Sequence, residues 1–264
     1  MPYADNNGVQ IYYEVAGEGP PMILVHAMPF DHSQWVYQIA RFSTWFKVIA
    51  MDVRGHGRSA NVRTPFTFHD MGDDVLAVLK AEKADRAILQ GVSIGSRLGA
   101  LLGLEHPEIF RAVVLVGASV GPGLLSPNRW DRIANFEEKG GDYRIVHLEA
   151  GVSKGFAASP RGKYLLDTFM ERNARFDGKA IGQVFRSFNE DDLRPAMPKM
   201  KTPALIVNGE FDHSLPNARE TAALIPGAVH KILPATGHAC NLEDPAGYDA
   251  LVIDWLEERG LMPK

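Results

Sequence analysis

The sequence has little of three features that would indicate disulfides, a polyanionic partner or a membrane span: cysteine, an excess of one charge, and long apolar runs. Its single cysteine, Cys240, rules out an internal disulfide and a site built from several thiolates. The formal charge of −4 gives no general attraction to nucleic acid or anionic lipid. No apolar run approaches the roughly 20 residues that span a bilayer, and the first residues lack the pattern of a secretion signal. We therefore expect a cytoplasmic protein that binds neither membranes nor nucleic acid.

Metal-binding and cofactor-binding patterns are also missing. The nine histidines include no H-E-x-x-H pair on one helix face, and there is no cysteine pair. The pattern Gly55-x-Gly57 lacks the third glycine of a dinucleotide-binding turn. We expect no metal and no cofactor, and we interpret Cys240 as a small buried residue rather than a redox nucleophile.

What the chain does have is a globular composition, with 264 residues of which 45% are hydrophobic. Short apolar runs alternate with longer amphipathic ones, which is typical of βαβ units. The predicted strands are Val9–Glu14, Met22–His26, Val48–Asp52, Ala87–Gln90, Ala112–Gly117, Ala204–Asn208 and Val229–Leu233. The predicted helices are His69–Glu82, Ile94–Glu105, Ala218–Ile225 and Gly247–Arg259. Together they predict an α/β fold with a mostly parallel, twisted sheet and helices on both faces.

One interval breaks this alternation. Residues 118–203 contain amphipathic segments and glycine or proline breaks but no convincing strand. We interpret this interval as an inserted helical lid, and residues 1–117 and 204–264 as the α/β core. The predicted lid helices are Pro127–Glu138, Tyr143–Leu148, Tyr164–Arg175 and Ile181–Asn189. A lid over the carboxyl ends of the strands would cover the place where open α/β sheets bind ligands.

A nucleophile motif follows the fourth predicted strand. The strand runs directly into Gly91-Val92-Ser93-Ile94-Gly95 and then a helix, which is the strand–turn–helix setting that G-x-S-x-G requires. Such a turn lifts the hydroxyl of Ser93 above the sheet and leaves no room for side chains two residues away on either side. The alternative is a glycine-rich turn in which Ser93 only caps the helix.

A serine nucleophile needs a base, and the base needs an acid that orients it. Both residue types follow the last two predicted strands. Glu210 and Asp212 lie after Ala204–Asn208, and His238 lies after Val229–Leu233. Because these strands should be parallel neighbours, their carboxyl ends, and the loops that follow, should meet at one edge of the sheet.

The order serine, acid, histidine, each after a strand, resembles that of the α/β-hydrolase superfamily. The resemblance covers nearly the whole chain and implies a catalytic triad of Ser93, Asp212 and His238. Asp212 is preferred over Glu210 because it stands at the superfamily's position for the acid. Within the superfamily, the serine nucleophile is typical of small esterases, enol-lactonases and cofactor-free haloperoxidase-like or perhydrolase-like proteins.

The resemblance also implies an oxyanion hole and part of a substrate pocket. The segment His26-Ala27-Met28-Pro29-Phe30 is similar to the superfamily's His-Gly-x-Pro loop, with alanine in place of glycine. The backbone amides of Met28 and Ile94 are the expected donors to the oxyanion, with Ala27 as the alternative to Met28. We expect Ala27, Phe30 and Trp130 to contact substrate.

Two further segments are similar to superfamily sequences. Asp52-Val53-Arg54-Gly55-His56-Gly57-Arg58-Ser59 is similar to a D-x-R-G-x-G-x-S turn, for which we predict a structural role with an internal Asp–Arg pair. The stretch from His238 to Pro245 resembles the one that follows the catalytic histidine in enol-lactonases and related small hydrolases.

The combined interpretation is a serine hydrolase of a small carboxylic ester or lactone that works through an acyl-enzyme. A single base predicts activity that rises through one ionisation near ~6–7. The alternatives are a C–C bond hydrolase of ring-cleavage products, a perhydrolase or haloperoxidase-like enzyme, and a small-ligand sensor on the same fold. The expected partner is a small molecule with an activated carbonyl, and a homodimer is compatible with the sequence.

Overall fold

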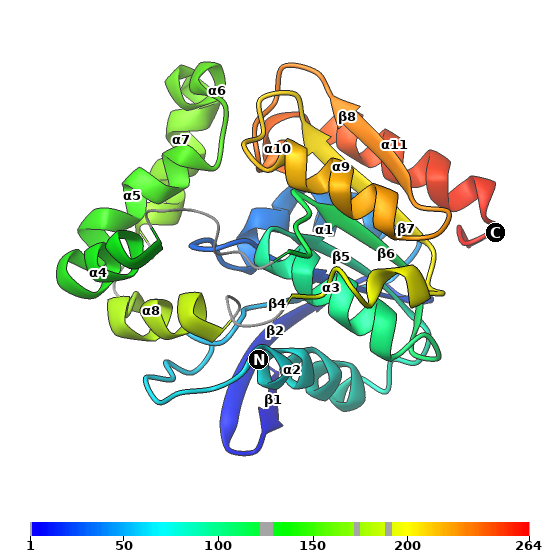
Figure 1. Ribbon diagram of the computed structural model, residues 1–264, viewed down its shortest axis with the longest axis horizontal. Helices are drawn as coiled ribbons and strands as arrows, with labels where there is room; N and C mark the ends of the chain where they lie inside the picture. The colour runs from blue at the N-terminus through cyan, green and yellow to red at the C-terminus, as the bar shows by residue number, and fades with distance from the viewer. Residues whose placement is uncertain (1, 122–128, 172–174, 188–191, 264) are drawn as a thin grey trace.

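The computed structural model describes residues 2–121, 129–171, 175–187 and 192–263. Its centre is an eight-stranded sheet in the order β1-β2-β4-β3-β5-β6-β7-β8 (Figure 1). The strands are β1 (Tyr3–Asn6), β2 (Val9–Ala16), β3 (Pro21–Val25), β4 (Lys47–Met51), β5 (Ala87–Val92), β6 (Phe110–Val116), β7 (Ala204–Gly209) and β8 (Val229–Leu233). β2 runs antiparallel to β1 and β4, and all other neighbours pair in parallel. The α/β fold with a mostly parallel sheet is thereby confirmed.

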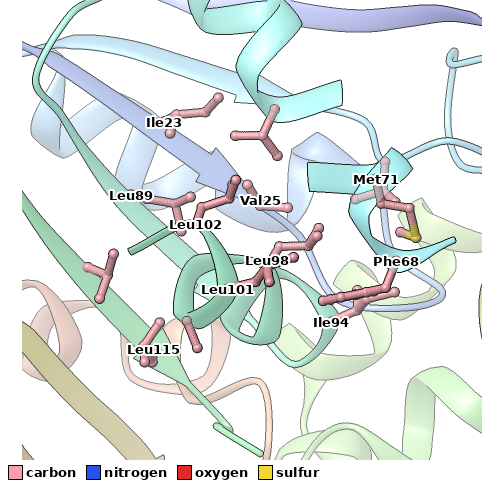
Figure 2. Packing of buried hydrophobic residues seen from close by; sticks show 14 of the residues in the cluster. Ile23, Val25, Phe68, Met71, Leu89, Ile94, Leu98, Leu101, Leu102 and Leu115 are labelled. Atoms are coloured by element: carbon pink, nitrogen blue, oxygen red, sulfur yellow. The ribbon is translucent and has the colours of Figure 1, made fainter. Parts of the chain in front are cut away.

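Helices cover both faces of this sheet because side chains alternate between the faces along each strand. The core helices are η1 (His32–Trp35), α1 (Val36–Phe42), α2 (Phe68–Ala81), α3 (Ile94–Glu105), α9 (Leu215–Leu224), α10 (Cys240–Glu243) and α11 (Pro245–Glu258). Val25, Leu89 and Leu115 point to the face covered by α2 and α3, where Figure 2 shows them beside Leu98 and Leu101. Alternate strand residues point to the opposite face and pack with α1, α10 and α11. Among the described residues, no helix is both long and apolar enough to cross a membrane.

The insertion between β6 and β7 is helical, and its described part contains no strand. It comprises α4 (Arg129–Lys139), α5 (Gly141–Ala150), α6 (Lys154–Ala158), α7 (Pro160–Met170), α8 (Gly178–Ser187) and the short η3 (Met197–Lys199). Helices α4 to α8 stand beside the core rather than on its sheet (Figure 1). Four of them overlap the predicted lid helices; residues 127–128, 172–174 and 188–189 of those predictions lie outside the described residues. Met197 and Met200 belong to the cluster that packs on α3, so the end of the insertion lies on the core.

In the glycine-rich turn after β4, Arg54 pairs outside the turn and not with Asp52. Arg54 donates through Nε and a terminal nitrogen to the carboxylate of Asp74 on α2, at 2.6 and 2.7 Å. Asp52 instead accepts the backbone amides of His32 and Arg58, at 2.7 and 2.8 Å. The turn folds back toward the end of β4, so Asp52 accepts hydrogen bonds from nearby backbone amides. The longer side chain of Arg54 reaches the neighbouring helix α2.

Candidate active site

The sharpest local feature is the turn that joins β5 to α3. Ser93 adopts φ +56° and ψ −109°, a strained backbone conformation for a residue with a Cβ. A methyl group added at Gly91 would lie 2.1 Å from the carbonyl oxygen of Gly95, and one added at Gly95 would lie 2.2 Å from that of Val25. Both flanking glycines are therefore required by close backbone approaches, which also hold the turn against the end of β3.

Ser93 stands at the carboxyl end of the sheet with its side chain partly exposed. Its amide donates to the carbonyl oxygen of Val116 at the end of β6, with an N–O distance of 2.8 Å. Its hydroxyl makes no hydrogen bond to another residue in the described part of the chain. Catalytic hydrogen bonds are often long in the absence of substrate, so this geometry is compatible with a nucleophile.

Asp212 and His238 come together after β7 and β8, as the strand order predicts. The Nδ1–H of His238 donates to Oδ1 of Asp212 at 2.8 Å. The His238 ring lies against Gly117, where an added methyl group would come within 2.4 Å of Cε1. Gly117 follows Val116, the residue that binds the Ser93 amide. The structure thus places the imidazole of His238 beside the turn that holds Ser93.

The Asp212 carboxylate is buried and fully bonded. Besides His238, its Oδ1 accepts the amide and the hydroxyl of Ser214, each at 2.8 Å, and its Oδ2 accepts the side-chain amide of Asn208 at 2.7 Å. Burial alone would raise the pKa of Asp212, but His238 and the bonds from Ser214 hold it below its ordinary value. Asp212 therefore remains charged and fixes the orientation of the imidazole.

The contact with Asp212 also changes the pKa of His238. Burial would lower the pKa of its imidazole, but the charge and hydrogen bond of Asp212 outweigh burial and raise the pKa above the ordinary value.

The other candidate acid, Glu210, does not bond to His238: its exposed carboxylate accepts the amide of Ala235 at 2.9 Å. The geometry therefore favours Asp212 over Glu210 as the partner of His238.

The loop after β3 lies beside the turn of Ser93. The Ala27 amide donates to Oε1 of Gln34 at 2.7 Å and is thus already occupied. The amide of Met28 has no acceptor among the described residues, and that of Ile94 lies in the first turn of α3, where helix amides lack internal partners. Of the two candidates in this loop, Met28 is therefore the available donor.

The residues predicted to contact substrate occupy different environments. Ala27 is buried, and the Phe30 ring packs edge-on against Phe169 with centroids 5.0 Å apart. Trp130, on α4, is 59% exposed. Their contacts with substrate stay predictions.

Three residues near His238 were missed by the sequence reasoning. The His213 ring lies against that of His238 in a tilted arrangement, with ring centroids 4.6 Å apart. The charges of Arg132 of α4, His238 and His213 lower the pKa of His147 of α5, and Arg132 and His238 also lower that of His213. His213 could have been noticed because it follows Asp212 directly, whereas the positions of His147 and Arg132 depend on how the insertion folds.

Two groups of side chains have potential metal-ligand atoms within 4.8 Å of one another: Asp212 with His213 and His238, and Asp31 with His32 and Asp52. In each group an imidazole already donates to a carboxylate, at 2.8 and 2.7 Å. Hydrogen bonding accounts for both arrangements, and the absence of a metal stays a prediction.

Comparison with known proteins decides the family. Residues 20–245 match the family described as alpha/beta hydrolase fold. The chain belongs to the α/β-hydrolase family. This hydrolase is 25% identical to the 3-oxoadipate enol-lactonase 2 of Acinetobacter baylyi, over 92% of each chain. The enol-lactonase of Burkholderia xenovorans LB400 has a similar structure, with a TM-score of 0.89 and 27% identity over 97% of this chain and 100% of that one.

A second solved structure is Est816, described as an N-acyl homoserine lactone degrading enzyme. It aligns with this hydrolase at a TM-score of 0.82 and 28% identity, covering 96% of this chain and 99% of its own. The resemblance inferred from the sequence is therefore confirmed at the level of the family.

Proposed function

We propose that this hydrolase cleaves a small carboxylic ester or lactone through an acyl-enzyme formed on Ser93. The observation that carries the proposal is the 2.8 Å hydrogen bond from His238 to Asp212, with the imidazole against the strained turn that presents Ser93. This combination supplies a nucleophile, a base and a group that orients the base. The enol-lactonase and the homoserine lactone degrading enzyme among the similar proteins support a lactone or ester as substrate.

The proposed reaction uses each group in turn. Nε2 of His238 removes the hydroxyl proton as Oγ of Ser93 attacks the substrate carbonyl, and the carbonyl electron pair moves onto the oxyanion. The amides of Met28 and Ile94 donate to that oxyanion. The bond to the leaving oxygen breaks as this oxygen takes the proton from His238. Water, deprotonated by His238, then attacks the acyl-enzyme, and the bond to Oγ of Ser93 breaks as Oγ takes that proton back from His238, which releases the acid and free Ser93.

The test compares the native protein with Ser93→Ala on p-nitrophenyl esters from acetate to decanoate and on simple γ-lactones. We expect native turnover that peaks at one acyl length and a loss of at least about 10³-fold in kcat for Ser93→Ala. Ser43→Ala, which removes a hydroxyl from the end of α1, is the matched control and should retain native rates. A native protein that neither turns over these substrates nor reacts at Ser93 with a fluorophosphonate would contradict the proposal.

A further inference from the structure

One face of lid helix α5 contacts the loops on both sides of the proposed active site. At one end of this face, Arg144 donates through Nε to the carbonyl oxygen of Pro29 in the loop after β3, at 2.9 Å. At the other end, just after α5, the carbonyl oxygen of Gly151 accepts the amide of Ala239, next to His238, at 2.7 Å. His147 lies between these two contacts, one turn from each, and therefore on the same face. Its imidazole is thus placed between the proposed oxyanion loop and the proposed base.

His213 forms a second wall of this space. Its ring contacts that of His238 at an interplanar angle of 39°, and its Nδ1 lies 3.8 Å from Oδ1 of Asp212. The side chain is 69% exposed, so one face of the imidazole covers His238 while the other is open. A ligand that reaches Ser93 beside His238 would pass the ring of His213.

Arg132 brings a positive charge to the same space. It lies one helical turn before Phe136 on α4, and the Phe136 ring contacts the His147 ring with centroids 5.3 Å apart. Arg132 is partly buried, and no carboxylate of the described residues forms an ion pair with it. By contrast, Arg186 of α8 pairs with Glu137, the neighbour of Phe136, at 2.7 Å. Among the described residues, Arg186 thus has an acidic partner in this region and Arg132 has none.

The two flanking imidazoles are neutral at neutral pH. Burial, then Arg132, His238 and His213, lower the pKa of His147 to about 3. Burial of its ring against the site, followed by the charge of His238, lowers the pKa of His213 to about 4, with Arg132 adding to the effect and Asp212 opposing it. Each neutral ring can donate one hydrogen bond, and the guanidinium of Arg132 supplies the charge.

We propose that Arg132, assisted by His147 and His213, binds an anionic group of the substrate, so that the preferred ester or lactone carries a carboxylate away from its scissile carbonyl. This inference rests on the proposed function for the identity of the reacting bond. Arg132 is partly buried and has no carboxylate partner among the described residues, so it gains most from a ligand that brings one, because a carboxylate accepts two parallel hydrogen bonds from the guanidinium.

The kinetic test uses two esters of equal acyl length, mono-4-nitrophenyl adipate, which is an anion, and 4-nitrophenyl hexanoate, which is neutral. We expect kcat/KM to favour the anion, and Arg132→Gln to lower this preference by about tenfold, the effect of 1.4 kcal/mol. Arg132→Lys should restore part of it because the charge returns. Lys139→Gln removes the same charge from an exposed position on α4 and should leave the preference unchanged. An Arg132→Gln protein with the native preference would overturn the proposal.

A binding test separates this proposal from the proposed reaction. Calorimetric titration of the Ser93→Ala protein with monomethyl adipate and with dimethyl adipate requires no turnover. Tighter binding of the anion, lost when Arg132→Gln is added, supports the anion site even if neither 4-nitrophenyl ester is hydrolysed. Equal affinities for the two compounds would overturn the anion site even if Ser93-dependent hydrolysis is found.

Discussion

At the scale of single residues, the bond between Asp212 and His238 should determine how activity depends on pH. The base must be neutral to accept a proton, and Asp212 raises its pKa against the opposing effect of burial. We therefore expect kcat/KM to rise with pH through one ionisation whose midpoint lies above the ordinary histidine value of ~6.5. The check is a pH–rate profile of the native protein on its best p-nitrophenyl ester.

Asp212→Asn should move this midpoint to lower pH because it removes the charge that raises the pKa of His238 and leaves burial, which lowers it. The maximal rate should also fall by about 10³- to 10⁴-fold, since the imidazole loses its orienting partner. An NMR titration of His238 in the Ser93→Ala protein, with and without Asp212→Asn, measures the same shift without catalysis. A midpoint that does not move would show that Asp212 does not act on the proposed base.

The three proposed catalytic residues could be found from the sequence because each follows a strand that is strongly apolar and therefore easy to recognise. Their bonded partners were harder to find. Asn208 lies at the end of β7 and Ser214 lies in the loop after it, and neither belongs to a motif. Only the structure shows that both donate to the carboxylate of Asp212. Arg132 carries no signal at all, because its approach to the site depends on the packing of α4 against α5.

At the scale of elements, one buried carboxylate connects the helical insertion to the loop that carries the proposed base. Glu243, in α10, accepts the amide of Ser153 at 2.9 Å and the amide of Gly237 at 2.8 Å, both through Oε1. Ser153 caps the start of α6 in the insertion, and Gly237 precedes His238. A cleft of about 880 Å³ lies along this contact, between α5 to α7 and the loops after β7 and β8. Glu243 therefore bonds the insertion and the core together beside an open cleft.

Glu243→Ala should destabilise the protein because it leaves two buried amides without an acceptor, at a cost of about 1–3 kcal/mol each. At 264 residues we expect a fall in Tm of at least roughly 4 °C. Glu243→Gln, which keeps one carbonyl oxygen, should lose less. Glu257→Ala on the exposed side of α11 is the matched control and should melt as the native protein does. Thermal unfolding followed by circular dichroism compares the four proteins, and equal Tm values for Glu243→Ala and the control would contradict the bridge.

Elements were predictable where apolar periodicity was strong and were missed where tertiary contacts create them. Helix α3 has the predicted bounds Ile94–Glu105 because its apolar residues continue from the nucleophile motif. Strand β1 was not predicted because its four residues are mostly polar and exposed. It forms a strand because it pairs with β2. Strand β8 was predicted correctly in position, but it is an edge strand whose residues remain largely accessible.

At the scale of the whole molecule, buried neutral histidines should make the fold sensitive to acid. The Nδ1–H of His26 donates to the carbonyl oxygen of Ala27, and its Nε2 accepts the amide of Val53, so a second proton would face that amide. His56 lies edge-on against His26, with centroids 5.0 Å apart, and its buried Nε2 has no partner among the described residues. Burial lowers the pKa of both rings, and that of His56 falls well below the ordinary value.

A histidine whose pKa is lowered by folding binds its proton more readily in the unfolded chain. The free energy of unfolding should therefore decrease as the pH falls below ~6.5, by up to about 1.4 kcal/mol per pH unit for each such ring. His147, with its pKa of about 3, adds to the effect. Asp249, whose pKa burial raises to about 6, and Asp74, whose pKa burial also raises, oppose it, as do His32 and His238, whose pKa values rise beside carboxylates. The histidines with lowered pKa should dominate because His213 and His230 act in the same direction as His26, His56 and His147.

Urea unfolding at pH 6.5 and pH 5.0 tests this expectation. The native protein should be less stable at the lower pH, and His56→Gln should show a difference between the two pH values that is smaller by about 1.5 kcal/mol, because one proton no longer distinguishes the folded and unfolded chains. The variant is expected to lose some stability at both pH values, which does not affect the comparison. The native protein and His56→Gln could instead show the same change in the free energy of unfolding between the two pH values. The His26–His56 pair would then tolerate a buried charge, and the acid sensitivity would have to come from other groups.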